Sequence, residues 1–400
     1  MKQLFLHLCL LALLFCAGGV THAQTYQIIS TASSTVSNNV TKTVTTVQVG
    51  SNSLNRFLMT RVRKNIPNED LKGTILLLPP LGSGFQNYEV GDAGDYDNSF
   101  AGFFAKRNYD VWGYSQRAQG LTAGSCESNA IDCSVMADWG IQTIVDDVAF
   151  IRQQIEAAHP GEKPVVGGLS LGSIASIATI NAHPDDYAGA ILIEGTLYDE
   201  NTDVRNINTN FCAAFDDLLA HGVFYDAQGI QGFKLISHLA NVDPMGPTPL
   251  PGFPAGFTNH RAFVAAMSAP PLSPTTPRPG YNFLAGSVAE DRFFFVNEPL
   301  IHANIAVFVD YVANHTIRDV NCGLAGERTF SNNLHNFTGS VIVFAGGTGF
   351  GTGMVDTANL ITSAEVTVNF RPEYGHVDYV FSNDHLHEVE HAVLKWLEEE

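Results

Sequence analysis

The sequence predicts an α/β protein with a mostly parallel, doubly wound sheet. Strand-like and helix-like segments alternate between residues 74 and 194, which is typical of parallel strands joined by crossover helices. Residues 74–78 form a continuous apolar run, as expected for a central strand that is covered on both faces. Residues 165–182 pass from an apolar strand through a Gly-rich turn into a small-residue helix. These three observations favour layers of helices on both sides of one sheet.

The other elements of the first half follow from hydrophobic spacing and composition. Residues 26–64 are rich in Thr, Val and Ser and alternate in part, which predicts antiparallel strands that enter the sheet. Apolar residues at helical spacing predict the helices. The remaining segments are expected to be a helix over 99–107, a strand over 109–114, a helix over 139–158, a helix over 174–182 and a strand over 187–194.

The alternation of strands and helices stops at residue 197 and resumes at residue 340. Residues 197–335 contain helix-like pieces and a Pro-rich loop over 244–279, and they are too rich in aromatic residues for a disordered linker. We expect this segment to be an inserted cap between two parts of one core, 24–196 and 336–400. The second part should hold strands over 340–345 and 365–370 and a C-terminal helix that ends near residue 397.

The N-terminus has the pattern of a signal peptide. Lys2 precedes an apolar run over 4–16, and Thr21-His22-Ala23 resembles a cleavage site, so residues 1–23 are expected to be removed after Ala23. This predicts a secreted or periplasmic protein. Elsewhere no apolar stretch approaches the ~18 residues that a transmembrane helix needs. The formal net charge of −19 argues against nucleic acid and anionic membranes as partners.

Four cysteines remain after the signal peptide is removed. An even number in an exported protein favours disulfides. Of the three possible pairings, we favour Cys126 with Cys133 and Cys212 with Cys322, because the first two bracket a short loop. Free buried thiols are the alternative.

Ser170 is the candidate nucleophile. It stands in Gly168-Leu169-Ser170-Leu171-Gly172, a G-x-S-x-G motif that has the required strand before it and the required helix after it. A serine hydroxyl attacks well only when a histidine can take its proton on a sharp, exposed turn. The Leu171 N–H at the start of the helix would face a developing oxyanion. A chance match of five residues is the alternative.

These motifs resemble the α/β-hydrolase superfamily, and within it the chain is most similar to the gastric and lysosomal acid lipases. The family's Gly-Tyr-Asp-Val-Trp strand appears as residues 108–112, and its His-Gly-Leu-Leu and Asn-Trp segments are echoed by residues 79–82 and 87–88. Its Asn-His-Leu-Asp-Phe segment matches residues 375–379. The resemblance implies the α/β-hydrolase fold, His376 as the catalytic base, and the Leu81 N–H as the second oxyanion donor.

The acid of the triad is not where the family has it. The family's Gly-Gly-Asn-Asp turn is Gly-Gly-Thr-Gly at residues 346–349, so glycine stands at the acid's position. Glu194 is the preferred candidate, because it ends a buried strand on the same sheet edge as the elbow and needs only to reach the imidazole. Asp356 is the second candidate, although it matches a family Asp that caps the following helix. Asp199, or no acid at all, completes the alternatives.

The expected function is hydrolysis of carboxylic esters through Ser170, His376 and Glu194, with an acyl-enzyme and no metal or organic cofactor. The substrate is expected to be a small-molecule or lipid ester, and no oligomeric state is predicted. Hydrolysis of a polyester or amide and a catalytically silent binding scaffold are the alternatives. Aromatic side chains in the cap favour a hydrophobic substrate. The residues concerned are Phe253, Phe257, Phe283, Phe293, Phe294 and Phe295.

Residues 387–391 form a competing motif, H-E-x-x-H, which in other proteins binds catalytic zinc. The apolar stripe of the C-terminal helix places His387 and His391 on or near its polar face. A zinc protease also needs a third ligand downstream, and only nine residues follow His391. We therefore interpret the motif as a solvated helix face rather than as a metal site.

Overall fold

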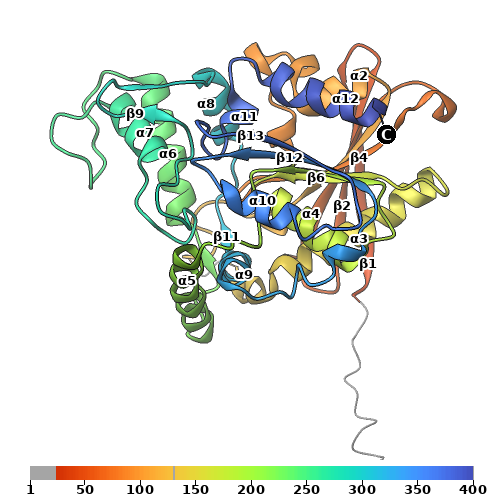
Figure 1. Ribbon diagram of the computed structural model, residues 1–400, viewed down its shortest axis with the longest axis horizontal. Coiled ribbons are helices and arrows are strands. Elements are labelled where there is room, and N and C mark those ends of the chain that lie inside the picture. The colour runs from red at the N-terminus through yellow and green to blue at the C-terminus, as the bar shows by residue number, and fades with distance from the viewer. Residues whose placement is uncertain (1–23, 129–130, 400) are drawn as a thin grey trace, which may run out of the picture.

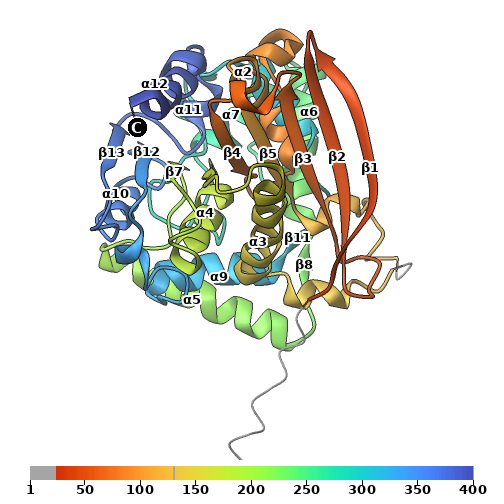
Figure 2. The ribbon, with the colours of Figure 1, turned by 90° about the vertical axis from the view of Figure 1, so that its right-hand side faces the viewer.

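The computed structural model describes residues 24–128 and 131–399, so the predicted signal peptide lies outside the described residues. The described chain builds a nine-stranded sheet with the order β1-β2-β3-β5-β4-β6-β7-β12-β13 (Figure 2). In this spatial order, each pair of neighbours from β5 to β13 is parallel, whereas β1, β2 and β3 pair antiparallel with their neighbours. The strands are β1 (Tyr26–Ser37), β2 (Val40–Val49), β3 (Arg56–Lys64), β4 (Gly73–Leu78), β5 (Tyr109–Ser115), β6 (Val165–Leu169), β7 (Gly189–Ile193), β12 (Ser340–Gly346) and β13 (Val366–Arg371).

Helices cover both faces of the sheet (Figure 1). Along β4, Leu76 and Leu78 belong to the core under one set of helices, and Ile75 and Leu77 belong to the core under the other set. Successive side chains of a strand point to opposite faces, so both faces of this strand are buried and its apolar run is uninterrupted. One face carries α3 (Ile141–Ala158), α4 (Leu171–Ala182) and α10 (Thr352–Ala358), and the other carries α2 (Phe100–Lys106) and α12 (His391–Glu399).

Two helix starts differ from the prediction. The helix expected over 139–158 begins at Ile141, where Asp319 from a distant helix accepts the Ile141 N–H at 2.8 Å. This N-terminal cap comes from tertiary packing, so local sequence could not show it. The helix expected over 174–182 begins at Leu171, directly after the elbow serine.

The segment between β7 and β12, which we call the cap after the predicted range 197–335, is mainly helical (Figure 1). The Pro-rich stretch 244–279 is not a continuous loop as predicted. It contains α7, whose first turn is capped by Thr258, which accepts the Arg261 N–H at 3.1 Å. The cap helices are α5 (Thr202–Ala220), α6 (Gln228–Val242), α7 (Asn259–Ser268), α8 (Glu298–Ala306) and α9 (Asn314–Ala325), with the short strand pairs β8 (Tyr225–Asp226) with β11 (Val312–Ala313) and β9 (Gly286–Ser287) with β10 (Arg292–Phe293).

Short turns complete the fold. The C-terminal helix follows a π-helical turn, η8 (Leu386–Glu390), and α11 (Asp378–Phe381) precedes that turn. Among the described residues, no helix is both long and apolar enough to cross a membrane. The 3-10 turns are η1 (Asn68–Asp70), η2 (Phe85–Tyr88), η3 (Asp92–Gly94), η4 (Tyr96–Asn98), η5 (Arg117–Gly120), η6 (Cys133–Asp138) and η7 (Leu334–Asn336).

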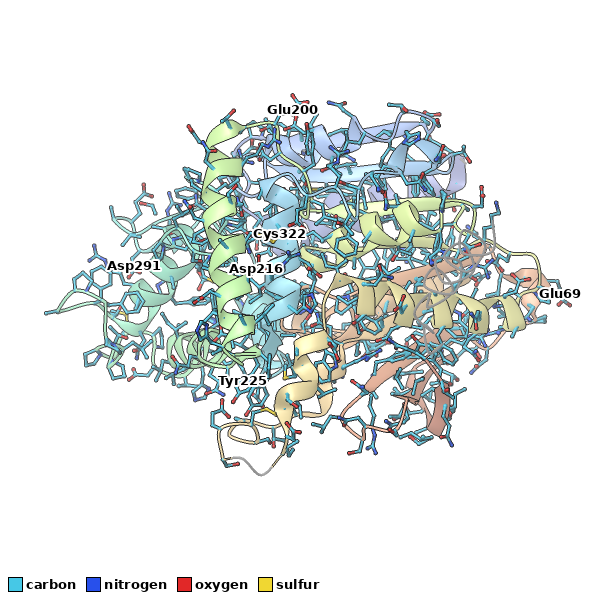
Figure 3. All side chains as sticks on the ribbon, turned by 90° about the horizontal axis from the view of Figure 1, so that it is seen from below. Glu69, Glu200, Asp216, Tyr225, Asp291 and Cys322 are labelled. Atoms are coloured by element: carbon cyan, nitrogen blue, oxygen red, sulfur yellow. A yellow bond between two sulfur atoms is a disulfide. The ribbon has the colours of Figure 1, made fainter. Side chains whose placement is uncertain are left out.

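Both favoured disulfides are confirmed, Cys126 with Cys133 and Cys212 with Cys322. The second joins α5 to α9, and Figure 3 shows α5, which carries Asp216, alongside α9, which carries Cys322. Arg318 on α9 also donates from Nε to Asp216 Oδ1 at 2.9 Å. The two helices are therefore held together by a covalent bond and by an ion pair.

The two disulfides should stabilise the fold by different amounts. Cys212 and Cys322 are separated by 110 residues in sequence and Cys126 and Cys133 by 7. Loop-closure entropy predicts that C212A/C322A lowers the free energy of unfolding by about 4 to 5 kcal/mol and C126A/C133A by about 2 kcal/mol. Urea denaturation of both double variants measures this difference. Equal losses would contradict the entropic explanation.

Candidate active site

Ser170 sits on a strained turn between β6 and α4. Its φ of 58° and ψ of −119° lie outside the regions that residues other than glycine favour. A Cβ at Gly168 or at Gly172 would overlap the Leu78 carbonyl oxygen of β4. The two glycines therefore let the elbow pack directly against the end of the neighbouring strand, as the motif requires.

His376 lies on the turn between β13 and α11, and its ring reaches the serine. The distance from His376 Nε2 to Ser170 Oγ is 2.8 Å. The ring is only 4 % exposed. It packs against Tyr281 and Phe350, with ring centroids 5.3 Å away in each case, and against Phe283 at 6.1 Å. Aromatic rings thus exclude water from the imidazole and restrict its orientation.

Glu194 follows β7 and meets the other side of the imidazole. Its Oε2 is 3.3 Å from His376 Nδ1, and the residue is fully buried. The carboxylate also accepts the N–H of Gly346 and, at 2.9 Å, the N–H of Phe350. Burial raises the pKa of the Glu194 carboxyl, whereas His376 and these N–H donors act in the opposite direction. These bonds fix the carboxylate against the ring.

Leu81 and Leu171, the residues predicted to donate to the oxyanion, line the cavity that Ser170 also lines. Leu171 is the first residue of α4, so its N–H has no acceptor within the helix. Leu81 lies in the loop after β4 and lines the same cavity as Ser170 and Leu171. Tyr88 fixes this arrangement, because its hydroxyl donates to the Leu78 carbonyl at 2.6 Å and accepts the Leu169 N–H at 2.9 Å. The ends of β4 and β6 are thereby tied together.

Ser170 and His376 open into an apolar cavity with a volume of ≈ 180 Å³. Among the described residues, its lining contains no Lys or Arg and a single carboxylate, Asp226, which accepts the N–H of Gln228 at 3.0 Å and caps α6. Of the six cap phenylalanines expected to favour a hydrophobic substrate, only Phe283 lines the cavity. The other apolar lining comes chiefly from Ile230, Phe233, Met267, Ile301, Ile305, Phe308, Val312, Ile317 and Val320.

Comparisons with known proteins agree with this architecture. A family model described as serine aminopeptidase, S33, matches residues 90–221. Among solved structures, the chain is similar to a putative lipase from Sulfolobus solfataricus, with 18% identity, a TM-score of 0.62, and coverage of 94% of this chain and 99% of that chain. It is also similar to a thermostable carboxyl esterase from Bacillus coagulans, with 12% identity, a TM-score of 0.53, and coverage of 90% and 98%. The chain has the α/β-hydrolase fold. No curated protein sequence matches it.

In this fold, Glu194 occupies the space that a side chain at residue 349 would need. A Cβ added to Gly349 would overlap Glu194 Oε2 and would lie 2.8 Å from the His376 Cα. Gly349, after β12, therefore leaves free the space that the Glu194 carboxylate, after β7, occupies. This contact explains why the turn at 346–349 lacks the carboxylate that the acid lipase pattern has there.

The other two acid candidates lie elsewhere in the hydrolase fold and have their own partners. Asp356 is inside α10 and accepts the Glu200 N–H at 2.9 Å, so the expectation that it caps this helix is wrong. Asp199 accepts the Asn201 N–H at 2.8 Å and lies 3.8 Å from Arg278 Nη1. Of the carboxylates that the structure describes, Glu194 is the one bonded to His376.

The H-E-x-x-H stretch lies at the start of the C-terminal helix. Glu388 accepts a hydrogen bond from the Tyr374 hydroxyl at 2.7 Å, and the His391 ring packs edge-on against Phe103 with centroids 5.0 Å apart. Among the described side chains, the group able to offer three metal ligands is Cys212, Cys322 and Glu327, and its two sulfurs form a disulfide.

Sequence patterns missed three residues that contact the site. Tyr281 and Phe350 enclose the imidazole but come from segments without periodicity. Asp378 stands two residues after His376, inside the stretch that resembles the acid lipases, and its spacing from the histidine was the available signal.

Replacing Gly349 by alanine should test how tightly the acid and the histidine are fitted. The new methyl group must displace the Glu194 carboxylate or the backbone of His376. A displacement of about 1 Å at a catalytic group costs roughly 10²-fold in rate, so we expect kcat to fall by about that factor. Steady-state kinetics of G349A measures it. An unchanged kcat would mean that the close fit between Gly349 and Glu194 does not matter for catalysis.

Proposed function

We propose that this protein is a serine hydrolase that cleaves carboxylic esters. The observation that carries the proposal is the hydrogen-bonded chain from Ser170 Oγ to His376 and from His376 to Glu194, with distances of 2.8 and 3.3 Å. A nucleophile, a base and a carboxylate in this order form the constellation that performs acyl transfer in unrelated folds.

In the proposed reaction, Ser170 Oγ attacks the ester carbonyl while His376 Nε2 takes the hydroxyl proton. Glu194 accepts the hydrogen bond from Nδ1–H and stabilises the imidazolium that forms. The Leu81 and Leu171 N–H groups donate to the oxyanion, a stabilisation of about 3 kcal/mol per donor. His376 returns the proton to the leaving alcohol. Water then attacks the acyl-enzyme by the same route and releases the acid.

The cavity supports a neutral, hydrophobic substrate. Its lining is predominantly apolar and contains no cationic side chain among the described residues, so nothing there offsets the desolvation of an anionic substrate. The two similar structures are named as a putative lipase and a carboxyl esterase, which agrees with this substrate class. We also propose that, within the α/β hydrolases, the chain is most similar to the acid lipases and that Leu81 belongs to its oxyanion loop.

The match to a serine aminopeptidase family makes amide hydrolysis the second candidate. An aminopeptidase needs a carboxylate for the ammonium group of its substrate. Asp226, the carboxylate in the cavity lining, already accepts the N–H groups of Gln228 and Gly229 at 3.0 and 3.3 Å. We therefore favour an ester. The two disulfides and the N-terminal leader pattern support a site of action outside the cytoplasm.

The test is hydrolysis of p-nitrophenyl esters with acyl chains from acetate to palmitate, compared with amino-acid p-nitroanilides. Ser170→Ala serves as the blank. We expect turnover of esters that is absent in the blank, with an optimum at a hydrophobic acyl chain. Preference for the anilides would favour the amidase, and no Ser170-dependent turnover of either class would favour a silent scaffold.

A further inference from the structure

The loop that carries His376 is bonded along its backbone to the cap. The His376 N–H donates to the Asn282 carbonyl at 2.9 Å, and the Val377 N–H donates to the Phe283 carbonyl at 2.9 Å. The same cap segment reaches the loop after β12, because the Asn282 N–H donates to the Thr348 carbonyl at 2.7 Å. That loop supplies the N–H of Phe350 to Glu194. One short stretch of the cap thus contacts the supports of both the histidine and the acid.

A single oxygen of Asp378 also joins the histidine loop to the cap, and we call this contact between the loop and residues 282–285 the junction. Asp378 Oδ2 accepts the Gly375 N–H at 2.5 Å, just before the histidine, and the Ala285 N–H at 2.9 Å from the cap. The residue is fully buried, and its Oδ1 has no hydrogen-bond partner among the described residues. Burying a carboxyl group with one unpaired oxygen lowers the stability of the fold, so the presence of Asp378 here calls for a functional reason.

We propose that Asp378 is a positioning residue that fastens the cap segment 282–285 to the histidine loop and so fixes the His376 ring against Ser170. The link to catalysis rests on the proposed function, in which the ring takes the Ser170 proton. The ring of Tyr281, just before this segment, and the ring of Phe283, within it, pack on the imidazole at 5.3 and 6.1 Å. Releasing the segment would therefore free both the backbone and the ring of His376.

This junction defines which part of the cap can move. Three backbone hydrogen bonds and the Asp378 carboxyl hold residues 282–285 on the core, so this segment forms a fixed wall of the site. Any opening of the cavity for substrate must then come from elements beyond it, such as α6, α8 and α9, whose side chains also line the cavity.

Burial raises the pKa of Asp378 to about 7, and the charged groups that face it, Glu194 and Glu388, add to this rise. The folded protein therefore holds a proton there at pH values where the unfolded chain has lost it. By linkage, stability at this site is highest below about pH 4 and falls as the pH rises towards 7. An asparagine can keep its oxygen at the bridging position without the charge, so D378N should lose this pH dependence.

The experiment compares D378A and D378N with the wild type. For D378A we expect hydrogen–deuterium exchange in residues 282–285 and 375–378 to accelerate at least about tenfold, because both N–H bonds are lost. We also expect kcat to fall by roughly 10²-fold and KM to change only a few-fold, since the base is misplaced while most of the cavity lining lies outside 282–285. D378N should keep exchange protection and kcat near wild type. Its melting temperature should fall less than that of the wild type between pH 5 and pH 8.

Asp319→Ala is the matched control. Asp319 is also a buried carboxylate with a raised pKa that accepts a backbone N–H, from Ile141 at 2.8 Å, but it has no contact with His376 in the described structure. D319A should lower stability and leave kcat unchanged. Wild-type exchange and kcat in D378A would overturn the proposal, as would equal losses of kcat in D378A and D319A.

Two further outcomes are also decisive. If the wild type hydrolyses no ester, the proposed function fails, while the exchange measurement still decides whether Asp378 holds the cap segment. If D378A does not fold, D378N decides. A wild-type pH dependence of its melting temperature would overturn the assignment of Asp378 as the carboxyl group of this junction.

Discussion

Replacing Ser170 by alanine is expected to lower kcat for ester hydrolysis by about 10⁶-fold, the loss that follows removal of a nucleophile from such a triad. The reason is that His376, at 2.8 Å, would have no hydroxyl to deprotonate and no acyl-enzyme could form. A fluorophosphonate probe should label the wild type at Ser170 and leave the variant unlabelled, as intact-mass measurement would show.

Ser173→Ala provides the control for this prediction. Ser173 lies in the first turn of α4, is fully buried, and donates from Oγ to the Gly195 carbonyl at 2.8 Å. Its loss should cost about 1 kcal/mol of stability and change kcat only a few-fold. If S170A retained turnover above the level expected of the oxyanion donors alone, the assignment of the nucleophile would be wrong.

Glu194→Gln is expected to lower kcat by about 10⁴-fold, with a protein that still folds. The carboxylate accepts the N–H groups of Gly346 and Phe350 and meets His376 Nδ1. Gly346 donates to Oε1, whereas Phe350 donates to Oε2, the oxygen that also meets the ring, so the single oxygen of a glutamine can take only one of these two positions. With the oxygen at the Gly346 N–H, its NH₂ group faces the ring and selects the tautomer in which Nε2 carries the proton, so the base is blocked.

Asp356→Asn separates the two acid candidates. Asp356 accepts the Glu200 N–H, and an asparagine oxygen can replace that bond. We expect kcat within a few-fold of the wild type. The reverse result, a large loss in D356N with little change in E194Q, would move the acid role to Asp356 and would require the turn at 346–349 to rearrange.

The parts of the fold that could be predicted are those with a local signal. The strand pattern of β4, the elbow around Ser170 and the strand before Glu194 are each written within a few consecutive residues, and the doubly wound sheet is confirmed. The helix α7 escaped prediction because its prolines lie outside Asn259–Ser268, where they flank the helix without breaking it.

The identity of the acid could be narrowed but not fixed from sequence. What favours Glu194 over Asp356 is its contact with His376 Nδ1, between two segments that lie far apart in sequence and meet only in the folded sheet, whereas Asp356 accepts the Glu200 N–H. The same holds for Tyr281 and Phe350, whose contacts with His376 depend on how the cap meets the core. Tertiary contacts of this kind leave no period or spacing in the chain.

Ser170 and Glu194 share one feature that sets a limit on engineering this protein. Each follows the end of a parallel strand with a positive φ, 58° and 47°, and the Ser170 N–H donates to the carbonyl of Ile193, the residue before Glu194. Glycine relieves such strain, but at residue 194 it would also leave the N–H groups of Gly346 and Phe350 without their acceptor, so Ser170→Gly is the candidate for raising the melting temperature. A selection for thermostability alone would therefore favour the loss of the proposed nucleophile, and it must be paired with a screen for turnover.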